Sequence, residues 1–181
     1  MSLKKTVVLV GMMGSGKTAV GKAIAAELQV LFKDSDQEIS IAANRSIAEI
    51  FERDGEPFFR ARESEVISRL LDGTPCVLST GGGAFLAEVN RDNIAAYGVA
   101  LWLDADLDLL WNRVRYKDSR PLLRTADPKA TLGALYRDRV PLYRLADLSV
   151  RCDPRLSIDA MANRVIDKLL TRPDVLEKLD A

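Results

Sequence analysis

The stretch Gly11-Met12-Met13-Gly14-Ser15-Gly16-Lys17-Thr18 fits the pattern G-x-x-x-x-G-K-S/T, which is typical of a loop that binds nucleotide phosphates. It directly follows an apolar run at residues 6–10 and opens a stretch, residues 17–29, with apolar side chains at helical spacing. Glycines let backbone N–H groups turn towards phosphate oxygens, Lys17 would reach the β and γ phosphates, and Thr18 offers a hydroxyl group to Mg²⁺. We therefore expect a phosphate-binding loop between a strand and a helix.

Further apolar runs predict the rest of a sheet around this loop. Residues 76–80, 99–103 and 147–152 are each apolar enough to be covered on both faces, which is typical of strands in a parallel sheet. Helical patterns such as residues 57–71 lie between these runs. The alternation predicts an α/β protein with a three-layer P-loop NTPase fold, in which helices flank a central parallel sheet.

Size and composition favour one globular domain, residues 1–181, because apolar residues make up 48% of the chain and charged residues 29%. Lys plus Arg equals Asp plus Glu at 26 each, so the net charge gives no reason to expect nucleic acid or anionic lipid as a partner. No apolar stretch approaches the roughly 20 residues that cross a bilayer. We expect a cytoplasmic monomer with no membrane segment. The absence of histidine excludes histidine-based catalysis.

Local patterns also predict where elements begin and end. Ser46 and Glu49 have the spacing of a capping box, which predicts the start of a short helix. Residues 116–128 carry few large apolar side chains and many charges, so we expect a mobile segment there. The last helical pattern ends near residue 171, and we expect roughly the last eight residues to fray. Cys76 and Cys152 lie in or near apolar runs and are expected to be buried structural thiols.

Two acidic residues, Asp34 and Asp36, follow a short β-like stretch. Residues two apart in an extended chain project to the same side, so we expect both carboxylates to face one place. Phosphoryl transfer to an alcohol needs Mg²⁺ and a carboxylate that orients or deprotonates the hydroxyl group. Because the run at 76–80 ends in Ser-Thr without the usual acidic metal partner, Asp34 is the better candidate for Mg²⁺.

Glycines and arginines mark a second part of the candidate site. Gly81, Gly82 and Gly83 follow the run at 76–80, at the sheet edge where ligands bind in such folds. Guanidinium groups bind carboxylates and phosphates, and arginines that could do so are Arg60, Arg120, Arg139 and Arg155. Taken singly, each is more often a surface residue. The phosphate loop does not identify the acceptor, although the sequence lacks the Asn-Lys-x-Asp signature of a GTPase.

Six motifs recur in order, and together they resemble the shikimate kinase family over residues 7–170. They are the phosphate loop, Asp34-Ser35-Asp36, the stretch from Gly55-Glu56 to Phe59-Arg60, Ser79-Thr80-Gly81-Gly82-Gly83, Arg120-Pro121-Leu122-Leu123, and Arg139 to Pro141-Leu142-Tyr143 with Ala146-Asp147. The ordered set is more specific than any one motif. The resemblance implies a fold like that of nucleoside monophosphate kinases, with an acceptor-binding helical segment at about residues 35–63 and a mobile lid at about residues 116–128.

The resemblance implies ATP-dependent phosphorylation of the 3-hydroxyl of shikimate, which gives shikimate 3-phosphate and ADP in aromatic amino-acid biosynthesis. The residues implied for shikimate are Asp36, Arg60, Gly81, Gly82, Gly83 and Arg139. Those implied for ATP are Gly14, Ser15, Gly16, Lys17, Thr18, Ala19, Arg113, Arg120 and Arg155. Mg²⁺ would be held by Thr18 and Asp34. The residues implied in catalysis are Lys17, Asp36 as candidate base, and Arg120.

Two departures from the family's pattern stand out, and alternative functions stay open because other kinases share the phosphate loop, the lid and the fold. Residues 151–155 read Arg-Cys-Asp-Pro-Arg where many members carry a Thr-containing adenine loop, so Arg155 is a loose match. Leu145 replaces a common glutamate. The alternatives are a gluconate-type or nucleoside monophosphate kinase, and a shikimate relative such as quinate as acceptor. An alternative from another class is a sensor that binds ATP or a metabolite without turnover.

Overall fold

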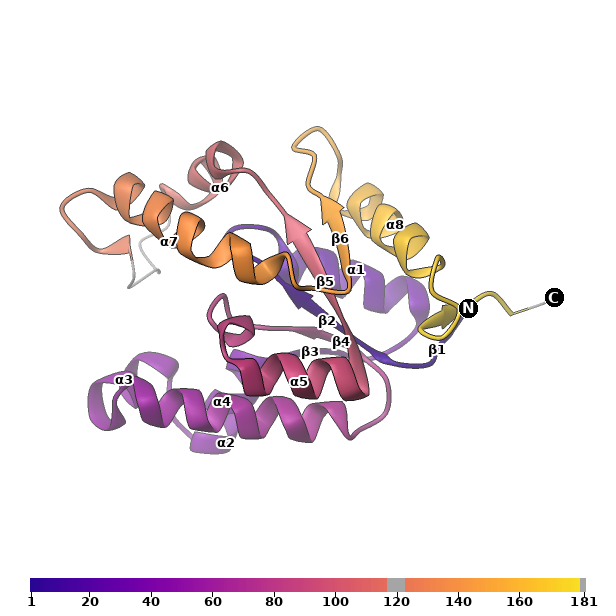
Figure 1. Cartoon of the computed structure of the whole chain (residues 1–181), viewed down its shortest axis with the longest axis horizontal. Helices are drawn as coiled ribbons and strands as arrows, with labels where there is room; N and C mark the ends of the chain where they lie inside the picture. The colour runs from indigo at the N-terminus through magenta and orange to yellow at the C-terminus, as the bar shows by residue number, and fades with distance from the viewer. Residues whose placement is uncertain (117–122, 180–181) are drawn as a thin grey trace.

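Five parallel strands form the central sheet in the part of the chain that the structure describes, in the order β3-β4-β2-β5-β6 (Figure 1). The computed structural model describes residues 1–116 and 123–179. The strands are β2 Thr6–Val10, β3 Phe32–Asp34, β4 Val77–Ser79, β5 Gly98–Asp104 and β6 Leu148–Arg151. The predicted α/β fold with a central parallel sheet is confirmed.

The position of each strand explains its pattern of apolar residues. All of β2 is buried, and Val7 lies opposite Val77 of β4 and Val99 of β5. A strand at the centre of a sheet that is covered on both faces has no polar side. At the edge, β6 alternates between buried and exposed residues, so the expectation that residues 147–152 are covered on both faces is wrong. One face of this outer strand remains in contact with solvent.

Helices cover both faces of the sheet, as the three-layer prediction requires. On one face, α1 Lys17–Leu28 packs against α8 Ile158–Leu169. On the other face, α4 Glu56–Leu71 packs against α5 Glu88–Tyr97 (Figure 1). Apolar side chains from both layers and from the sheet form one core. This core holds the carboxyl ends of the strands at fixed positions, and the candidate site lies there.

Shorter helices surround that edge of the sheet. α2 Ser35–Ala43 and α3 Ile47–Asp54 pack against α4, while α6 Leu107–Val114 packs against α7 Pro128–Tyr143. A 3₁₀ helix, Ala84–Leu86, follows the glycine run. The predicted capping box of α3 is confirmed, because Ser46 Oγ accepts from Glu49 N at 3.2 Å and Glu49 Oε2 accepts from Ser46 N at 2.8 Å. No helix in the described ranges has the length and apolar character needed to cross a membrane.

The first and last strands of the chain pair with each other. β1 Ser2–Leu3 and β7 Leu176–Glu177 form an antiparallel ladder in which Ser2 lies opposite Glu177 (Figure 1). Val175 and Leu176 are buried, and Lys5 Nζ lies 3.0 Å from Asp174 Oδ2. The expectation that the last eight residues fray is therefore wrong for residues 174–177. Their stabilising partners lie at the other end of the sequence, where a local pattern does not reveal them.

Candidate active site

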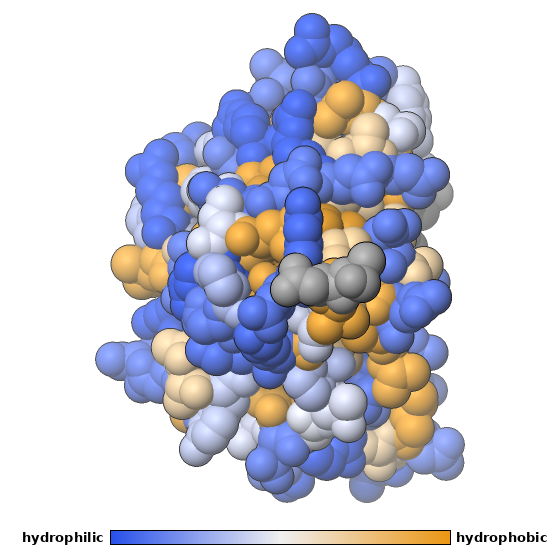
Figure 2. Space-filling model, turned by 90° about the vertical axis from the view of Figure 1, so that its right-hand side faces the viewer, coloured by the Kyte–Doolittle hydropathy of each residue, from blue (hydrophilic) through white to orange (hydrophobic). Residues whose placement is uncertain are grey.

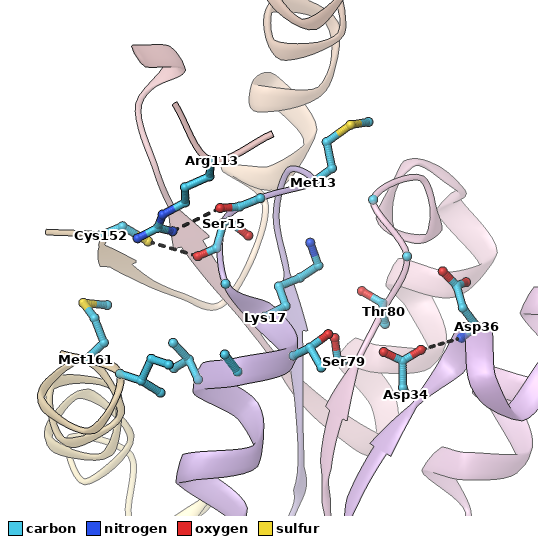
Figure 3. A pocket seen from close by; sticks show the side chains of 18 of the residues that line it. Met13, Ser15, Lys17, Asp34, Asp36, Ser79, Thr80, Arg113, Cys152 and Met161 are labelled. Carbon is cyan, nitrogen blue, oxygen red and sulfur yellow. Dashed lines mark hydrogen bonds between the residues drawn. The ribbon is translucent and has the colours of Figure 1, made fainter. Parts of the chain in front are cut away.

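A pocket of about 590 Å³ opens at the carboxyl ends of the parallel strands (Figure 3). The phosphate loop follows β2, Asp34 ends β3 and Gly81 lies just beyond β4, so three neighbouring strands bring polar residues to one edge of the sheet. Ligands bind at this edge in open parallel sheets. Lys17 stands in the middle of the pocket, with Asp36 to one side and Arg113 to the other.

The phosphate loop has the backbone that its glycines predict. Gly14 and Gly16 have φ angles of 82° and 96°, which residues with a Cβ rarely adopt. Gly16 is the N-cap of α1, so this helix directs its positive end into the pocket. Lys17 is 9% exposed, and its Nζ donates to the carbonyl groups of Gly11 at 2.7 Å and Met12 at 3.0 Å. The helix end and the ammonium group give this loop the positive charge that a phosphate group requires.

The two acidic residues reach the pocket by a different route from the one predicted. Asp34 is the N-cap of α2, and its Oδ1 accepts from the backbone N–H groups of Asp36 at 3.0 Å and Gln37 at 3.2 Å. Asp36 therefore lies in the first turn of a helix, and the expectation of an extended chain through both residues is wrong. Both carboxylates still line the pocket, because the cap turns the chain at the sheet edge.

The carboxylate of Asp36 is an unusual acceptor. Its pKa is raised above the ordinary value of 3.8, chiefly by burial and then by the charge of Asp34, while Lys17 and Arg60 act to lower it. Its Oδ1 is buried, and among the described residues no hydrogen-bond donor reaches it. A buried polar atom of this kind gains free energy when a ligand supplies a donor. Asp36 is therefore suited to accept a hydrogen bond from a hydroxyl group of a bound molecule.

Each glycine of the run 81–83 lies against one charged side chain. A Cβ atom would fall 3.0 Å from Oδ1 of Asp36 at the first glycine, 2.9 Å from Nη1 of Arg139 at the second and 2.7 Å from Nη1 of Arg60 at the third. The distances at the second and third glycines are shorter than real Cβ atoms show, and the distance at the first is tighter than nine in ten real Cβ contacts. The run thus leaves space for three charged groups to gather on one turn, next to the phosphate loop. The first two of these glycines line the pocket itself, and the third supports Arg60 beside it.

Glu63 was not predicted from the sequence, yet it contacts this cluster. Arg60 Nη1 donates to Glu63 Oε1 at 2.9 Å, and Glu63 is 1% exposed. Burial raises the pKa of the Glu63 carboxyl group, while the charge of Arg60 and its hydrogen bond lower it. The spacing of three residues on a helix places the two side chains together and could have indicated the pair.

Arg139 comes from α7 and is 7% exposed. Four residues later on the same helix, Tyr143 Oη donates to the carbonyl oxygen of Gly82 at 2.5 Å. Tyr143 occurs in one of the family motifs, but no role for it was predicted from the sequence. Its position on the helical face of Arg139 is the signal that could have found it.

One end of the pocket is lined by most of the residues that the sequence predicts for ATP. Of the residues predicted for ATP, those that line the pocket are Gly14, Ser15, Gly16, Lys17, Thr18, Ala19 and Arg113. Arg113 Nη1 donates to the carbonyl oxygen of Gly14 at 3.0 Å. Arg155 is not among the lining residues, since its side chain is 87% exposed and binds Asp153 at 2.9 Å. The hydrogen bond from Arg155 lowers the pKa of Asp153 to about 2. Arg120 lies outside the described residues.

The segment around Arg155 nevertheless contributes to the pocket through its apolar neighbours. The lining residues from this segment and from α8 are Cys152, Leu156, Ser157, Ile158 and Met161. Cys152 is buried, as predicted, and its Sγ donates to the carbonyl oxygen of Ser15 at 3.7 Å. Burial raises the pKa of this thiol to about 11, so it remains protonated near neutral pH. This end of the pocket suits the flat apolar faces of a nucleotide base.

Comparisons with known proteins agree on one family. A sequence model described as shikimate kinase matches residues 13–170. The shikimate kinase of Ruegeria pomeroyi is 69% identical over 176 residues, which cover 97% of this chain and 90% of that protein. Among solved structures, shikimate kinase from Acinetobacter baumannii in complex with shikimate is 34% identical and has a TM-score of 0.87, over 92% of this chain and 93% of that chain.

A more distant likeness bears on the alternatives. A gluconokinase from Sinorhizobium meliloti has a TM-score of 0.61 over 94% of each chain, but at 16% identity it shares the fold alone. The region that matches the family, by contrast, includes every predicted site residue. These matches confirm the resemblance that the ordered motifs indicated. The chain belongs to the shikimate kinase family, and it is therefore a kinase that takes its phosphoryl group from ATP.

Proposed function

We propose that this kinase transfers the γ-phosphoryl group of ATP to the 3-hydroxyl of shikimate and releases ADP and shikimate 3-phosphate. The observation that carries the proposal is the glycine run, against which one carboxylate and two guanidinium groups lie beside the phosphate loop. The shikimate complex of the Acinetobacter baumannii relative supports the same acceptor. We place the reaction in aromatic amino-acid biosynthesis, in the cytoplasm.

Shikimate, the acceptor in this proposal, is held through its carboxylate and through its 3-hydroxyl group. Arg60 and Arg139 bind the carboxylate, because a guanidinium group pairs with a carboxylate through two parallel hydrogen bonds. Asp36 accepts a hydrogen bond from the 3-hydroxyl group and so holds its oxygen in line with the γ phosphorus. Asp36 takes the proton of this hydroxyl group as the oxygen attacks the phosphorus. Gly81, Gly82 and Gly83 allow the ring to lie close to the backbone. The helical segment at residues 35–63 is thus the acceptor-binding part of one functional unit, residues 1–181.

The donor is bound at the other end of the pocket. Backbone N–H groups of the phosphate loop and the N-terminus of α1 hold the phosphates, and Lys17 stabilises the charge that develops on the γ-phosphoryl group. Arg113 lies beside the base. Arg155 has this role only if it leaves Asp153, so we assign the base contacts to the apolar residues of the segment instead.

Magnesium fits the oxygen ligands at this site. The hydroxyl group of Thr18 and the carboxylate of Asp34 line the same pocket, and the hydrogen bonds within α2 engage Oδ1 of that carboxylate. Hard cations such as Mg²⁺ prefer oxygen ligands of this kind. When bound, Mg²⁺ neutralises phosphate charge. We propose Thr18 and Asp34 as its protein partners, with water between Asp34 and the ion.

Closure of a lid completes the proposal. Residues 116–128, with Arg120, are proposed to cover the phosphates and to exclude water, so that the phosphoryl group passes to shikimate and not to solvent. Shortening this segment should raise ATP hydrolysis relative to transfer. An unchanged ratio would contradict the proposed role.

Turnover with a panel of acceptors tests the function. ADP formation is measured with ATP and Mg²⁺ in the presence of shikimate, quinate, gluconate, AMP or no acceptor, and the phosphorylated product is identified by mass spectrometry. We expect one equivalent of shikimate 3-phosphate per ADP with shikimate. Turnover with another acceptor in its place would retain the kinase and reject the substrate. Binding of ATP and shikimate without turnover would favour the sensor. Sedimentation of the same sample tests the proposed monomer.

A further inference from the structure

Tyr143 joins two parts of the acceptor end that come from distant positions in the sequence. It is the last residue of α7 and is 0% exposed. Its hydroxyl group donates to the carbonyl oxygen of Gly82 at 2.5 Å, a short hydrogen bond between a helix and the glycine run. The position of a Cβ at Gly82 would lie 2.9 Å from Arg139 Nη1 and 3.8 Å from Tyr143 Oη. The hydroxyl group of Tyr143 and the guanidinium group of Arg139 therefore both lie next to Gly82.

The ring of Tyr143 has little freedom to move. Trp102 of β5 stacks on it, with ring centroids 6.2 Å apart and an angle of 28° between the planes. Trp102 is itself 7% exposed and lies on β5, between β2 and β6 in the sheet. Stacked aromatic rings of this kind add to the free energy of packing beyond their buried area. The phenol oxygen is thus held against Gly82 from the side of the sheet.

The protonation of Tyr143 is also fixed. Burial raises its pKa to about 12, and Arg139 acts in the opposite direction through its charge and a hydrogen bond. The hydroxyl group stays protonated near neutral pH, so it donates its one proton to Gly82. Its lone pairs can then accept from Arg139, four residues earlier on the same helical face.

We propose that Tyr143 is a positioning residue for the acceptor carboxylate, which holds the Gly82 turn and the Arg139 guanidinium group in one arrangement. This inference rests on the proposed function, because it assigns the carboxylate of the acceptor to Arg139. Tyr143 does not touch the reacting atoms. It acts through Arg139 and Gly82, so its loss should weaken the binding of acceptors that carry a carboxylate and leave the nucleotide end unchanged.

The test compares Tyr143→Phe with Tyr136→Phe. Both tyrosines lie on α7, but Tyr136 has no hydrogen bond to the acceptor end among the described residues. Phenylalanine keeps the ring on Trp102 and removes only the hydroxyl group. We expect the KM for shikimate to rise roughly five- to tenfold in Tyr143→Phe, which corresponds to one lost hydrogen bond, while the KM for ATP stays as in the unaltered protein. Tyr136→Phe should leave both constants unchanged.

A matched pair of ligands separates positioning from a general loss of structure. Dissociation constants for shikimate and for its carboxamide are measured by calorimetry in both variants and in the unaltered protein. The preference for carboxylate over carboxamide should fall in Tyr143→Phe and persist in Tyr136→Phe. Equal weakening of both ligands, or a parallel loss of ADP binding, would show a structural role only and overturn the inference. If the unaltered protein itself neither binds nor phosphorylates shikimate, the proposed function fails instead.

Discussion

A Cβ atom at Gly83 would lie 2.7 Å from Nη1 of Arg60, so the side chain at this position has to be a hydrogen atom for Arg60 to stay where it is. The φ angle of Gly83 is −92°, which alanine adopts without strain. The constraint therefore comes from the neighbouring guanidinium group and not from the backbone.

Gly83→Ala should therefore impair acceptor binding more than stability. We expect at least a tenfold rise in the KM for shikimate, because the added methyl group displaces Arg60, and a change of less than about 1 kcal/mol in the free energy of unfolding. Gly73→Ala is the matched control, since a Cβ there meets its nearest atom at an ordinary 3.5 Å. Steady-state kinetics and urea unfolding measure the two effects. Equal kinetics in the two variants would contradict the crowding argument.

Lys17→Ala should reduce kcat by roughly 100- to 1,000-fold, the range for loss of one preorganised charged donor in a transition state. The ammonium group also donates to the carbonyls of Gly11 and Met12, so the affinity for ADP should fall as well. Lys22→Ala on the exposed side of α1 is the control. Single-turnover measurements separate the chemical step from binding. A kcat close to that of the control would exclude Lys17 from catalysis.

Glu63 should make stability depend on pH. Burial raises its folded-state pKa above the ordinary value of 4.5, so the folded protein binds this proton more tightly than the unfolded chain. The contribution of this proton to the free energy of unfolding is complete below the pKa of Glu63 in the unfolded chain. It is lost as the pH rises through the pKa of Glu63 in the folded protein. Glu63→Gln cannot ionise, so its stability relative to the unaltered protein should increase as pH rises above 4.5. Glu65→Gln, which replaces a side chain that is 60% exposed, is the control in the same urea unfolding measurements.

Removal of residues 174–181 should destabilise the protein by several kcal/mol, because it exposes the site where Val175 and Leu176 are buried. Removal of residues 178–181 alone leaves both strands of the terminal ladder and should change the free energy of unfolding by less than about 0.5 kcal/mol. Thermal unfolding of both shortened chains compares them. Similar midpoints would mean that the β1–β7 pairing contributes little.

Ser46→Ala removes one half of the capping box of α3 and should cost about 1 kcal/mol of stability. Because α3 packs against the acceptor-binding helix α4, a smaller rise in the KM for shikimate should accompany it. Ser68→Ala, at an exposed position inside α4, tests for a general effect of losing serine. It should be neutral or slightly stabilising, since alanine is the better helix former.

The features that the sequence predicted well are those encoded by neighbouring residues. The phosphate loop, the α1 helix and the capping box at Ser46 each depend on contacts within a few positions, and all three are present. The buried strands β2 and β5 were equally clear, because apolar residues without alternation predict a strand covered on both faces.

Two of the features that it missed are local side-chain contacts, and the others depend on contacts between distant segments. The spacing of Asp34 and Asp36 predicts an extended chain, whereas Asp34 is the N-cap of α2 and Asp36 lies in its first turn. Arg155 was matched to the nucleotide by position, yet Asp153 two residues earlier holds its guanidinium group in solvent. The order of charged groups along the glycine run, and the pairing of β1 with β7, required three-dimensional structure.

The pairing of Ser2 with Glu177 fixes where attachments to the protein would sit. The β1–β7 ladder leads into β2 at its amino end, whereas the pocket lies at the carboxyl ends of the strands (Figure 1). Figure 2 shows a surface on which charged and polar residues predominate, with smaller apolar areas between them. A tag, fusion partner or surface anchor joined at either strand of the ladder would therefore stand away from the mouth of the pocket. Protein molecules that are immobilised through either strand of the ladder would share one orientation, with the mouth of the pocket facing the solution.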